Sequence, residues 1–370
     1  MNNKKLRVLS LFSGIGAFEK AISNLNIDYE LVAFSEIDKY SIKSYCSIHN
    51  VDENLNLGDI SLISESKLKN LNIDLIVGGS PCQDFSTAGK QKGSIWTCNN
   101  CGYEYNPLIV HHSSRSNCPI CNNSDLIKTR SSLVVEMLRV IKITNPKYVV
   151  YENVKNITNS KFKNTFNLFL NELREYGYYV DWSILNSKDF NSAQSRERVF
   201  VVCSKIEFPS NIKNLNLASR KTINDILDTK NEHNYLDKDA YTLIDTPNQQ
   251  NAYKSLMFIG YLNKKTRFKN PSSKQLNYSR THRQANRIYS SKGISPTLLA
   301  QGTQYLILDS IGVRKIISKE AFRLMGFDDI DYFKCLNIGI SNTQLFKQAG
   351  NSIVIPVLEE IFKFLLYQQL

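Results

Sequence analysis

A cysteine follows a proline in the glycine-rich turn Gly78-Gly-Ser-Pro-Cys82, directly after an apolar run. A thiolate is a strong nucleophile at neutral pH, and nearby dipoles or cations activate it. The alternative for an isolated cysteine is burial as a small apolar side chain. Pro81 and Gln83 flank Cys82 in the turn, which argues against simple burial. The turn therefore predicts a covalent catalyst.

Two further clusters carry charges that suit such a nucleophile. Glu152-Asn-Val ends one apolar run with a carboxylate, and Gln194-Ser-Arg-Glu-Arg198 begins the next. Arg196 and Arg198 are two residues apart, so both side chains point to one face of an extended segment. The alternatives are a helix N-cap for Asn153 and a surface ion pair for the arginines.

A glycine turn, Leu11-Phe-Ser-Gly-Ile-Gly-Ala17, follows the first apolar run and opens a helical stretch. Small residues there let backbone N–H groups and a helix N-terminus approach a ligand closely. Glu36 ends the next apolar run, about 20 residues on, where a carboxylate can bind ribose hydroxyls. Asp59, in Gly58-Asp-Ile, suits either an adenine amino group or an Asx-turn. These residues predict a nucleotide-type pocket.

Four of the eight cysteines form two pairs, Cys98-Asn-Asn-Cys101 and Cys118-Pro-Ile-Cys121, with sixteen residues between them. This is the spacing of a four-thiolate zinc site. The alternative is a redox-active or metal-free loop. His111 and His112 are spare donors, but four cysteines already complete a tetrahedron.

An alternation of strands and helices over residues 7–203 must position these motifs. It predicts βαβ units and a mostly parallel sheet, with functional residues at the carboxyl ends of the strands. Strands are expected at 7–12, 31–35, 73–77, 148–151 and 199–203, and helices at 17–24, 38–47, 131–143 and 163–176.

From about residue 204 short strand-like pieces and polar loops replace the alternation, and helical periodicity returns only at about 353–368. An inserted small domain, after which the C-terminus packs back on the first domain, is the simplest account. A freestanding second domain with a dimerisation helix is the alternative.

The charge is concentrated in one part of the chain. The 370 residues carry a net charge of +12, and 42% of them are hydrophobic, which excludes a disordered chain. Such a basic balance indicates a polyanionic partner unless it is only a solvated basic face. Between Thr246 and Leu308 there is no Asp or Glu. That stretch holds ten cations, so affinity for a polyanion should fall steeply with salt.

The N-terminal residues show no secretory signal, and no apolar run approaches the length of a membrane span. The chain is therefore expected to be cytoplasmic, where cysteines do not form a disulfide framework.

Several motifs, in chain order, resemble those of the DNA cytosine-5 methyltransferases. The resemblance covers nearly the whole chain outside 94–128 and the middle of 204–290. Ser10 and Ala17 depart from the family's usual Asp and Gly beside the cofactor loop. The motifs are Phe12-Ser-Gly-Ile-Gly, Ser35-Glu-Ile-Asp-Lys-Tyr, Gly58-Asp-Ile, Pro81-Cys-Gln, Glu152-Asn-Val, Gln194-Ser-Arg-Glu-Arg and Gln348-Ala-Gly-Asn-Ser352.

The resemblance implies transfer of a methyl group from S-adenosyl-L-methionine to carbon 5 of a cytosine flipped out of double-stranded DNA. Cys82 would add to carbon 6, Glu152 would bind ring N3, and Arg198 would hold O2. Arg196 would help to hold Cys82, Glu152 or the phosphate. The cofactor would touch Phe12, Ser13, Gly14, Gly16, Glu36, Ile37, Asp59, Ile60, Pro81, Asn351 and Ser352.

The implied fold is α/β: a Rossmann-like methyltransferase sheet with helices on both faces, plus a smaller, mostly β target-recognition domain. The catalytic domain would span 1–203, with the cysteine insert at 94–128, the target-recognition domain 204–334, and a returning segment 335–370. Asn351 and Ser352 would complete the cofactor pocket from that segment.

The resemblance also implies DNA contacts. Gln83, Ser86 and Lys90 would act from the active-site loop. In the reader, at about 245–290, phosphates or guanine edges would be bound by Lys264, Lys265, Arg267, Lys269, Lys274, Arg280, Arg283 and Arg287, and adenine by Gln275, Asn277, Gln284 and Asn286.

The cysteine insert interrupts the loop that closes on flipped DNA in this family. We hypothesise that it contacts DNA; the competing interpretation is a zinc ribbon packed on the protein for stability alone. The expected context is a monomer in a bacterial or phage modification system, with or without a cognate restriction endonuclease. An RNA methyltransferase, an inactive DNA-binding module and an NAD oxidoreductase are the alternatives.

Overall fold

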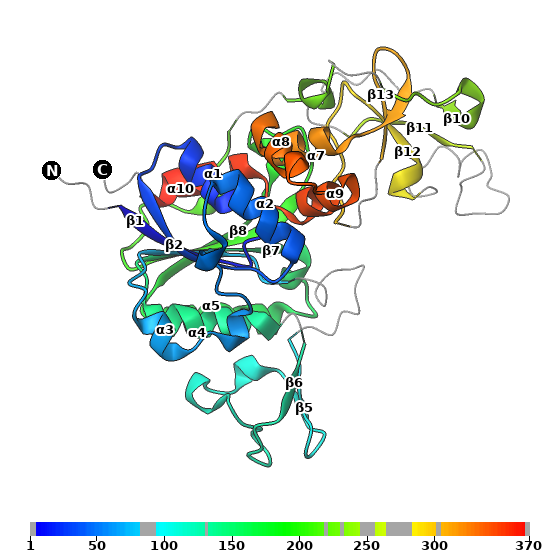
Figure 1. The fold of residues 1–370 in the computed structure, drawn as a ribbon. Coiled ribbons are helices and arrows are strands. Elements are labelled where there is room, and N and C mark those ends of the chain that lie inside the picture. Colours follow the sequence, from blue (N-terminus) through cyan, green and yellow to red (C-terminus); the bar gives the residue numbers. More distant parts are fainter. Residues whose placement is uncertain are drawn as a thin grey trace. The chain divides into compact units, whose positions relative to one another are not determined.

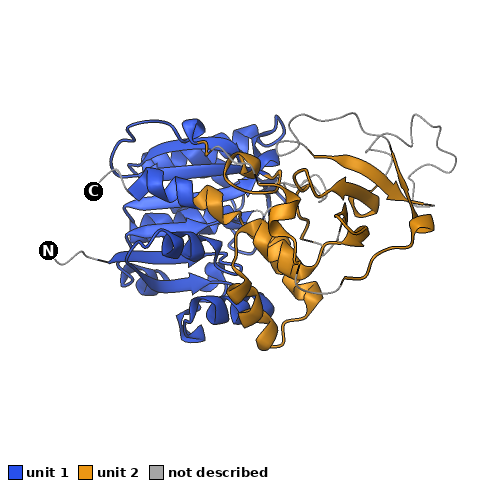
Figure 2. Ribbon diagram, turned by 90° about the horizontal axis from the view of Figure 1, so that it is seen from above, with its two compact units in different colours: residues 1–185, 197–215, 359–370 blue, residues 186–196, 216–358 orange. Residues whose placement is uncertain are grey.

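The computed structural model describes residues 5–81, 94–129, 132–217, 221–229, 233–244, 256–263, 283–300 and 305–366. Contacts divide the chain into two compact units, shown in different colours in Figure 2. Unit 1 comprises 1–185, 197–215 and 359–370, and unit 2 comprises 186–196 and 216–358. These units cut the chain at other positions than the functional domains predicted above, and that functional division stays a prediction.

Unit 1 is built on a six-stranded sheet in the order β2-β1-β3-β7-β9-β8. The β1–β2, β1–β3 and β3–β7 pairs are parallel, and β7–β9 is antiparallel, so the expected parallel centre is confirmed. The strands are β1 (Leu6–Leu11), β2 (Tyr29–Ser35), β3 (Leu75–Gly78), β7 (Tyr148–Val154), β8 (Tyr179–Asn186) and β9 (Glu197–Ser204).

Helices cover both faces of this sheet (Figure 1). On one face lie α1 (Ala17–Asn24) and α10 (Ile355–Leu366), whose Phe18 and Phe362 rings meet edge to face. On the other lie α3 (Glu65–Lys69), α4 (Leu133–Thr144) and α5 (Lys163–Glu175). The helix α2 (Lys39–His49) begins where the Asp38 side chain accepts hydrogen bonds from Tyr40 N and Ser41 N, which is an ordinary N-cap.

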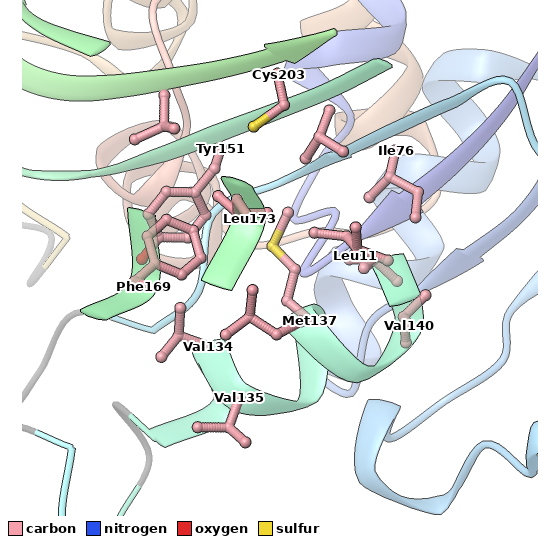
Figure 3. Packing of buried hydrophobic residues seen from close by; sticks show 14 of the residues in the cluster. Leu11, Ile76, Val134, Val135, Met137, Val140, Tyr151, Phe169, Leu173 and Cys203 are labelled. Carbon is pink, nitrogen blue, oxygen red and sulfur yellow. The ribbon is translucent and has the colours of Figure 1, made fainter. Parts of the chain in front are cut away.

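The main core lies between the sheet and the helices α4 and α5 (Figure 3). Met137 and Val140 of α4 and Leu173 of α5 are fully buried there. Cys203 of β9 belongs to the same core, and burial raises the pKa of its thiol well above the usual range. A neutral, fully buried thiol is inert, so Cys203 is a packing residue.

Residues 94–128 form a small three-stranded antiparallel sheet in the order β5-β4-β6. The strands are β4 (Trp96–Cys98), β5 (Glu104–Tyr105) and β6 (Leu126–Lys128). The 3-10 helix η3 (Pro107–Ile109) follows β5.

Unit 2 combines a five-stranded sheet with helices. The sheet order is β10-β11-β12-β13-β14, and its core consists of Ile259, Ile288, Leu306 and Val313. The strands are β10 (Tyr241–Leu243), β11 (Phe258–Leu262), β12 (Arg287–Ser290), β13 (Leu306–Leu308) and β14 (Val313–Lys315).

Between β14 and α10 the structure describes the helices α7 (Ser318–Met325), α8 (Asp329–Asn337) and α9 (Asn342–Asn351). The expectation that helical periodicity returns only at about residue 353 is therefore wrong. Within the described residues, no helix is long and apolar enough to span a membrane.

Candidate active site and metal centre

Glu152 and Arg198 form an ion pair between the neighbouring strands β7 and β9. The register places Glu152 opposite Phe200 and Val154 opposite Arg198, so the two charged residues are diagonal neighbours on one face. Arg198 Nε lies 3.0 Å from Glu152 Oε1, and the two side chains are 18% and 12% exposed. The structure thus brings together two residues that were predicted to be catalytic.

The turn that leads towards Cys82 passes close to this carboxylate. A Cβ atom at Gly79 would lie 3.0 Å from Glu152 Oε2 and 3.2 Å from the backbone oxygen of Glu152. A side chain at position 79 would therefore press on Glu152, so glycine suits this close approach. Cys82 itself lies outside the described residues.

A buried hydrogen-bond network fixes the residue before Pro81. Asn153 Nδ2 donates to Ser80 O at 3.2 Å and to the Tyr151 hydroxyl at 2.7 Å. The Tyr151 hydroxyl lies 2.9 Å from Ser80 Oγ. Asn153 thus tethers the turn through its side chain, whereas the residue that caps the 3-10 helix after β7 is Val154. Sequence reasoning missed Tyr151 and Ser80, although a hydroxyl in a buried strand is itself a signal that a partner is present.

Arg196 belongs to unit 2 and is almost completely buried there. Its guanidinium donates to the backbone oxygens of Leu298, Gly350 and Ser352, each at 2.9 Å. At Gly350 a Cβ atom would lie 2.4 Å from Leu299 O, so only glycine fits. Arg196 therefore holds the backbone of the segment that contains Asn351 and Ser352, and its catalytic role stays a prediction.

The glycine turn and Glu36 meet at the carboxyl ends of β1 and β2. Phe12, Gly14 and Gly16 all have positive φ, at 53°, 56° and 81°. Gly14 N donates to Glu36 Oε2 at 2.8 Å. Ile37 N and Asp38 N donate to Glu36 Oε1 at 2.7 and 2.8 Å.

This arrangement fits a ribose-bearing ligand. A carboxylate has about four acceptor positions, and three N–H groups fill three of them on Glu36, which leaves one on Oε2 for a hydroxyl. A Cβ atom at Gly14 would meet nothing within 4 Å, and Ile37 is 72% exposed. The turn therefore offers open space and apolar surface beside the acceptor.

Asp59 makes the Asx-turn that was the alternative to an adenine contact. Its Oδ1 accepts from Ser61 N at 2.8 Å and from Ser61 Oγ at 2.7 Å, at the start of the 3-10 helix η2 (Ile60–Leu62). Ser13 Oγ donates to Ser10 O at 3.1 Å, and Ile60 is buried. Contacts of these residues with a cofactor stay predictions.

The four predicted zinc ligands converge in the insert. Their sulfur atoms all lie within 4.8 Å of one another, with 3.5 Å between Cys98 and Cys121 and 3.7 Å between Cys101 and Cys118. A tetrahedron with Zn–S bonds of about 2.3 Å has sulfurs about 3.8 Å apart, so the set fits this ion. The two knuckles close alike, because Gly102 N and Asn122 N bond to Cys98 O and Cys118 O, each at 2.9 Å.

The insert packs on the helix layer of unit 1. Trp96, Tyr105 and Leu108 join the core that α4 and α5 contribute to. Arg115 forms a buried two-pronged ion pair with Glu172 of α5, with 2.8 Å between Nη1 and Oε1. These contacts favour the interpretation that the insert stabilises the protein.

Most of the predicted DNA-contacting residues lie outside the described part of the chain. These are Gln83, Ser86, Lys90, Lys264, Lys265, Arg267, Lys269, Lys274, Gln275, Asn277 and Arg280. Arg283 caps a short 3-10 helix, and Arg287 begins β12. Gln284 Nε2 donates to Thr297 O at 2.8 Å. The side chain of this predicted base reader therefore already makes one hydrogen bond within unit 2.

Comparisons with known proteins match nearly the whole chain. The model of the C-5 cytosine-specific DNA methylase family matches residues 6–112 and 120–366. The orphan methyltransferase M.SPBetaI of Bacillus phage SPbeta is 33% identical over 98% of both chains. The type II methyltransferase M.HhaI of Haemophilus parahaemolyticus is 28% identical over 96% of this chain and 93% of its own.

Solved structures show the same fold. The Dnmt2 methyltransferase of S. pombe has a TM-score of 0.64 at 19% identity and covers 99% of both chains. A putative DNA modification methyltransferase from an E. coli prophage has a TM-score of 0.60 at 19% identity, over 98% of this chain and 99% of its own. The chain belongs to the C-5 cytosine-specific DNA methylase family and is a DNA cytosine-5 methyltransferase.

Proposed function

We propose that the enzyme flips a target cytosine out of duplex DNA and methylates it through a covalent adduct with Cys82. The observation that carries this proposal is the Glu152–Arg198 pair beside the turn that leads to Cys82. A carboxyl group that can donate a proton to N3, and a guanidinium that can donate to O2, are the groups needed to hold this edge of a cytosine, and here they share one face of two neighbouring strands.

The thiolate of Cys82 adds to carbon 6, and the electron pair of the C5–C6 double bond becomes available at carbon 5. Glu152, carrying a proton in the complex, donates it to N3 and so stabilises the negative charge that develops on the ring. S-adenosyl-L-methionine, when bound, would supply an electrophilic methyl group to carbon 5, and its sulfur would leave as the thioether S-adenosylhomocysteine. A base then removes the carbon 5 proton, the C5–C6 double bond re-forms, and the bond from sulfur to carbon 6 breaks.

Arg198 has donors left for the base. Its Nε contacts Glu152, and its Nη1 donates to Glu197 O at 2.8 Å. A guanidinium carries five N–H groups, so the remaining donors can reach O2 of the cytosine. Arg196 acts as a positioning residue in this proposal, because its Nη1 and Nη2 atoms donate to three backbone oxygens.

The resemblance to the family implies which residues would hold the cofactor. These are Phe12, Gly14, Glu36 and the Asp59-Ile60 turn, together with Asn351 and Ser352. The four cysteines would hold one structural Zn²⁺, which supports the insert. The substrate would be double-stranded DNA, bound by a monomer of a bacterial or phage modification system.

The test is expression in a host that lacks cytosine methylation, followed by bisulfite sequencing. We expect protected cytosines in one sequence context, and we expect Cys82→Ala to lose nearly all protection. Normal methylation by Cys82→Ala would overturn the covalent mechanism. Methylation of tRNA but not of duplex DNA in parallel assays would overturn the choice of substrate.

A further inference from the structure

A cavity of about 910 Å³ lies within unit 1, between the cysteine insert, α4 and the η2–α3 segment. None of the predicted catalytic or cofactor residues lines it. Its volume is in the range of pockets that hold small molecules, which is about 300–1,000 Å³. The insert supplies one wall, so the cavity exists only because this chain carries residues 94–128.

Cations outnumber carboxylates in the lining. Five Lys and Arg residues and two glutamates contribute to it. The cations are Lys69, Arg115, Lys128, Arg139 and Lys142.

Both glutamates are already engaged. Glu65 pairs with Lys69 at 3.6 Å. Glu136 pairs with Lys128 at 3.2 Å and with Arg139 at 2.8 Å. Arg115 is also neutralised, by Glu172 of α5, so two of the five positive charges are left unbalanced.

Lys142 is the cation that is best placed to receive an anion. In the described parts of the chain no carboxylate pairs with it, and its Nζ lies 2.8 Å from His112 Nδ1 instead. Burial, and then the charge of Lys142, lower the pKa of His112, so the imidazole beside the ammonium is neutral. Ser113 and Ser116 add hydroxyl donors from the same wall.

The cavity also has apolar walls. Leu62 and Ile63 contribute from the η2 side and Val135 from α4. Trp96 contributes only an edge from the insert, because it is 3% exposed and Lys128 Nζ lies 4.6 Å from its ring centre. A phosphate alone would leave this apolar surface exposed to water, whereas a phosphate joined to a flat organic group would cover it.

We propose that this cavity binds a small phosphorylated molecule of the nucleoside phosphate class, with its phosphate at Lys142 and its base towards Trp96. DNA is the disfavoured source of that phosphate. Residues 94–128 carry two cations, Arg115 and Lys128, against two carboxylates, Glu104 and Asp125, so the wall has no cationic excess with which to track a DNA backbone.

The experiment uses Trp96 as the reporter. The chain has two tryptophans, so Trp182→Phe leaves Trp96 alone. Inorganic pyrophosphate and uridine diphosphate are titrated into the full-length Trp182→Phe enzyme, with saturating S-adenosylhomocysteine to keep the probes out of the cofactor pocket. We expect a saturable change in Trp96 emission, larger for the nucleotide, with a Kd of about 1 mM or below.

Three variants in the same background test the assignment to Lys142. Lys142→Gln should weaken binding about tenfold, because a charge-assisted hydrogen bond is lost. Lys142→Arg should retain binding within about threefold. Lys161→Gln is the matched control, since Lys161 is exposed on the same unit and contacts only the Phe162 ring in its cation–π pair. The comparison uses only variants whose melting temperature and methyl-transfer activity equal those of the Trp182→Phe parent.

Three results would overturn the proposal. One is the absence of a Trp96 signal up to about 10 mM of either probe, a concentration at which even weak specific sites fill. Another is equal affinity in Lys142→Gln and Lys161→Gln. A third is displacement of the probe by a non-specific DNA duplex, which would identify the DNA backbone as the occupant.

Discussion

The buried pair between Arg115 and Glu172 predicts how strongly the cysteine insert is attached to unit 1. Arg115→Met would keep the apolar stem and remove the guanidinium. Glu172 would then be left as a buried carboxylate that accepts a hydrogen bond from the Tyr176 hydroxyl. The backbone oxygens of Pro107 and Val110, which accept from Arg115 Nε at 2.8 and 2.9 Å, would lose that donor.

The magnitude follows from burial. Arg115 and Glu172 are 7% and 5% exposed, so solvent screens the pair weakly. Removing one partner of a buried ion pair costs about 3–5 kcal/mol of folding free energy. This figure includes part of the cost of leaving the two backbone oxygens without a donor. A loss of about 4 kcal/mol lowers the melting temperature of a unit of this size by about 10 °C.

The assay is thermal unfolding of the zinc-loaded enzyme, together with amide hydrogen exchange over residues 94–128. The matched control is Arg174→Met, which removes a guanidinium from the exposed side of the same helix, where it bonds only Asn171 in the described contacts. We expect Arg174→Met to shift the melting temperature by about 1 °C at most.

The double variant Arg115→Met with Glu172→Met separates the pair from simple truncation. Replacing both charges with apolar groups removes the uncompensated carboxylate, so the double variant should cost less than the sum of the single ones by at least about 1 kcal/mol. If Arg115→Met has the same melting temperature as Arg174→Met, and the amides of the insert keep their protection from exchange, the inference that this pair holds the insert on α5 is wrong.

Four further predictions concern the site, the metal and unit 2. Tyr151→Phe should cost about 1–2 kcal/mol and lower kcat more than it changes KM for DNA, because the network at Ser80 loosens; thermal unfolding and steady-state methyl transfer measure this. Glu152→Gln should lower single-turnover methyl transfer about 100-fold or more with DNA affinity little changed. Metal analysis should find one zinc per chain, and Cys118→Ser should lower this content and the melting temperature. The hydrogen bond from Arg323 lowers the pKa of Asp329 to about 2. The charge of Asp329 therefore stabilises the fold fully above its ordinary pKa of 3.8, and this stabilisation is lost as the pH falls through 2. In Asp329→Asn, the free energy of unfolding measured in urea should depend less on pH over this range.

Apolar runs predicted the central strands well because those strands are buried on both faces. The sequence 148–151 reads as a continuous apolar run, and the structure buries every residue of it in β7. The edge strand β8 was missed for the opposite reason. Only Leu185 of its eight residues is buried, so its sequence alternates weakly and carries charge.

The helices α7 to α9, which the sequence analysis missed, contain polar residues at buried positions. Glu320 of α7 is fully buried, and its carboxylate is held by Arg314 at 2.7 and 3.0 Å. The apolar residues of α7 do gather on one side of the helix, so its amphipathic pattern was a signal that the sequence analysis overlooked. The burial of Glu320 could not be read from that pattern, because a glutamate normally indicates a surface position. Only the tertiary ion pair makes its burial understandable.

In the site, too, local sequence patterns predicted some placements and could not predict others. The placement of Glu152 and Arg198 follows from strand ends and from alternation along a strand, so local pattern was enough. The contacts of Arg196 join it to residues 102 to 156 positions further along the chain. No local pattern encodes such a partner, and a buried arginine on backbone oxygens reads in the sequence like an arginine in an active site.

The ends of the cysteine insert show how it joins the rest of unit 1. Ile95 and Thr129 bond to each other in both directions, with Ile95 N to Thr129 Oγ1 and Thr129 N to Ile95 O each at 3.1 Å. The pairing of β4 with β6 continues from this closure, so the two ends of the insert lie side by side. The closure precedes α4, which begins at Leu133. The docking of the insert on α5 through Arg115 is a separate contact, so a change in the Arg115–Glu172 pair tests the docking without changing the closure.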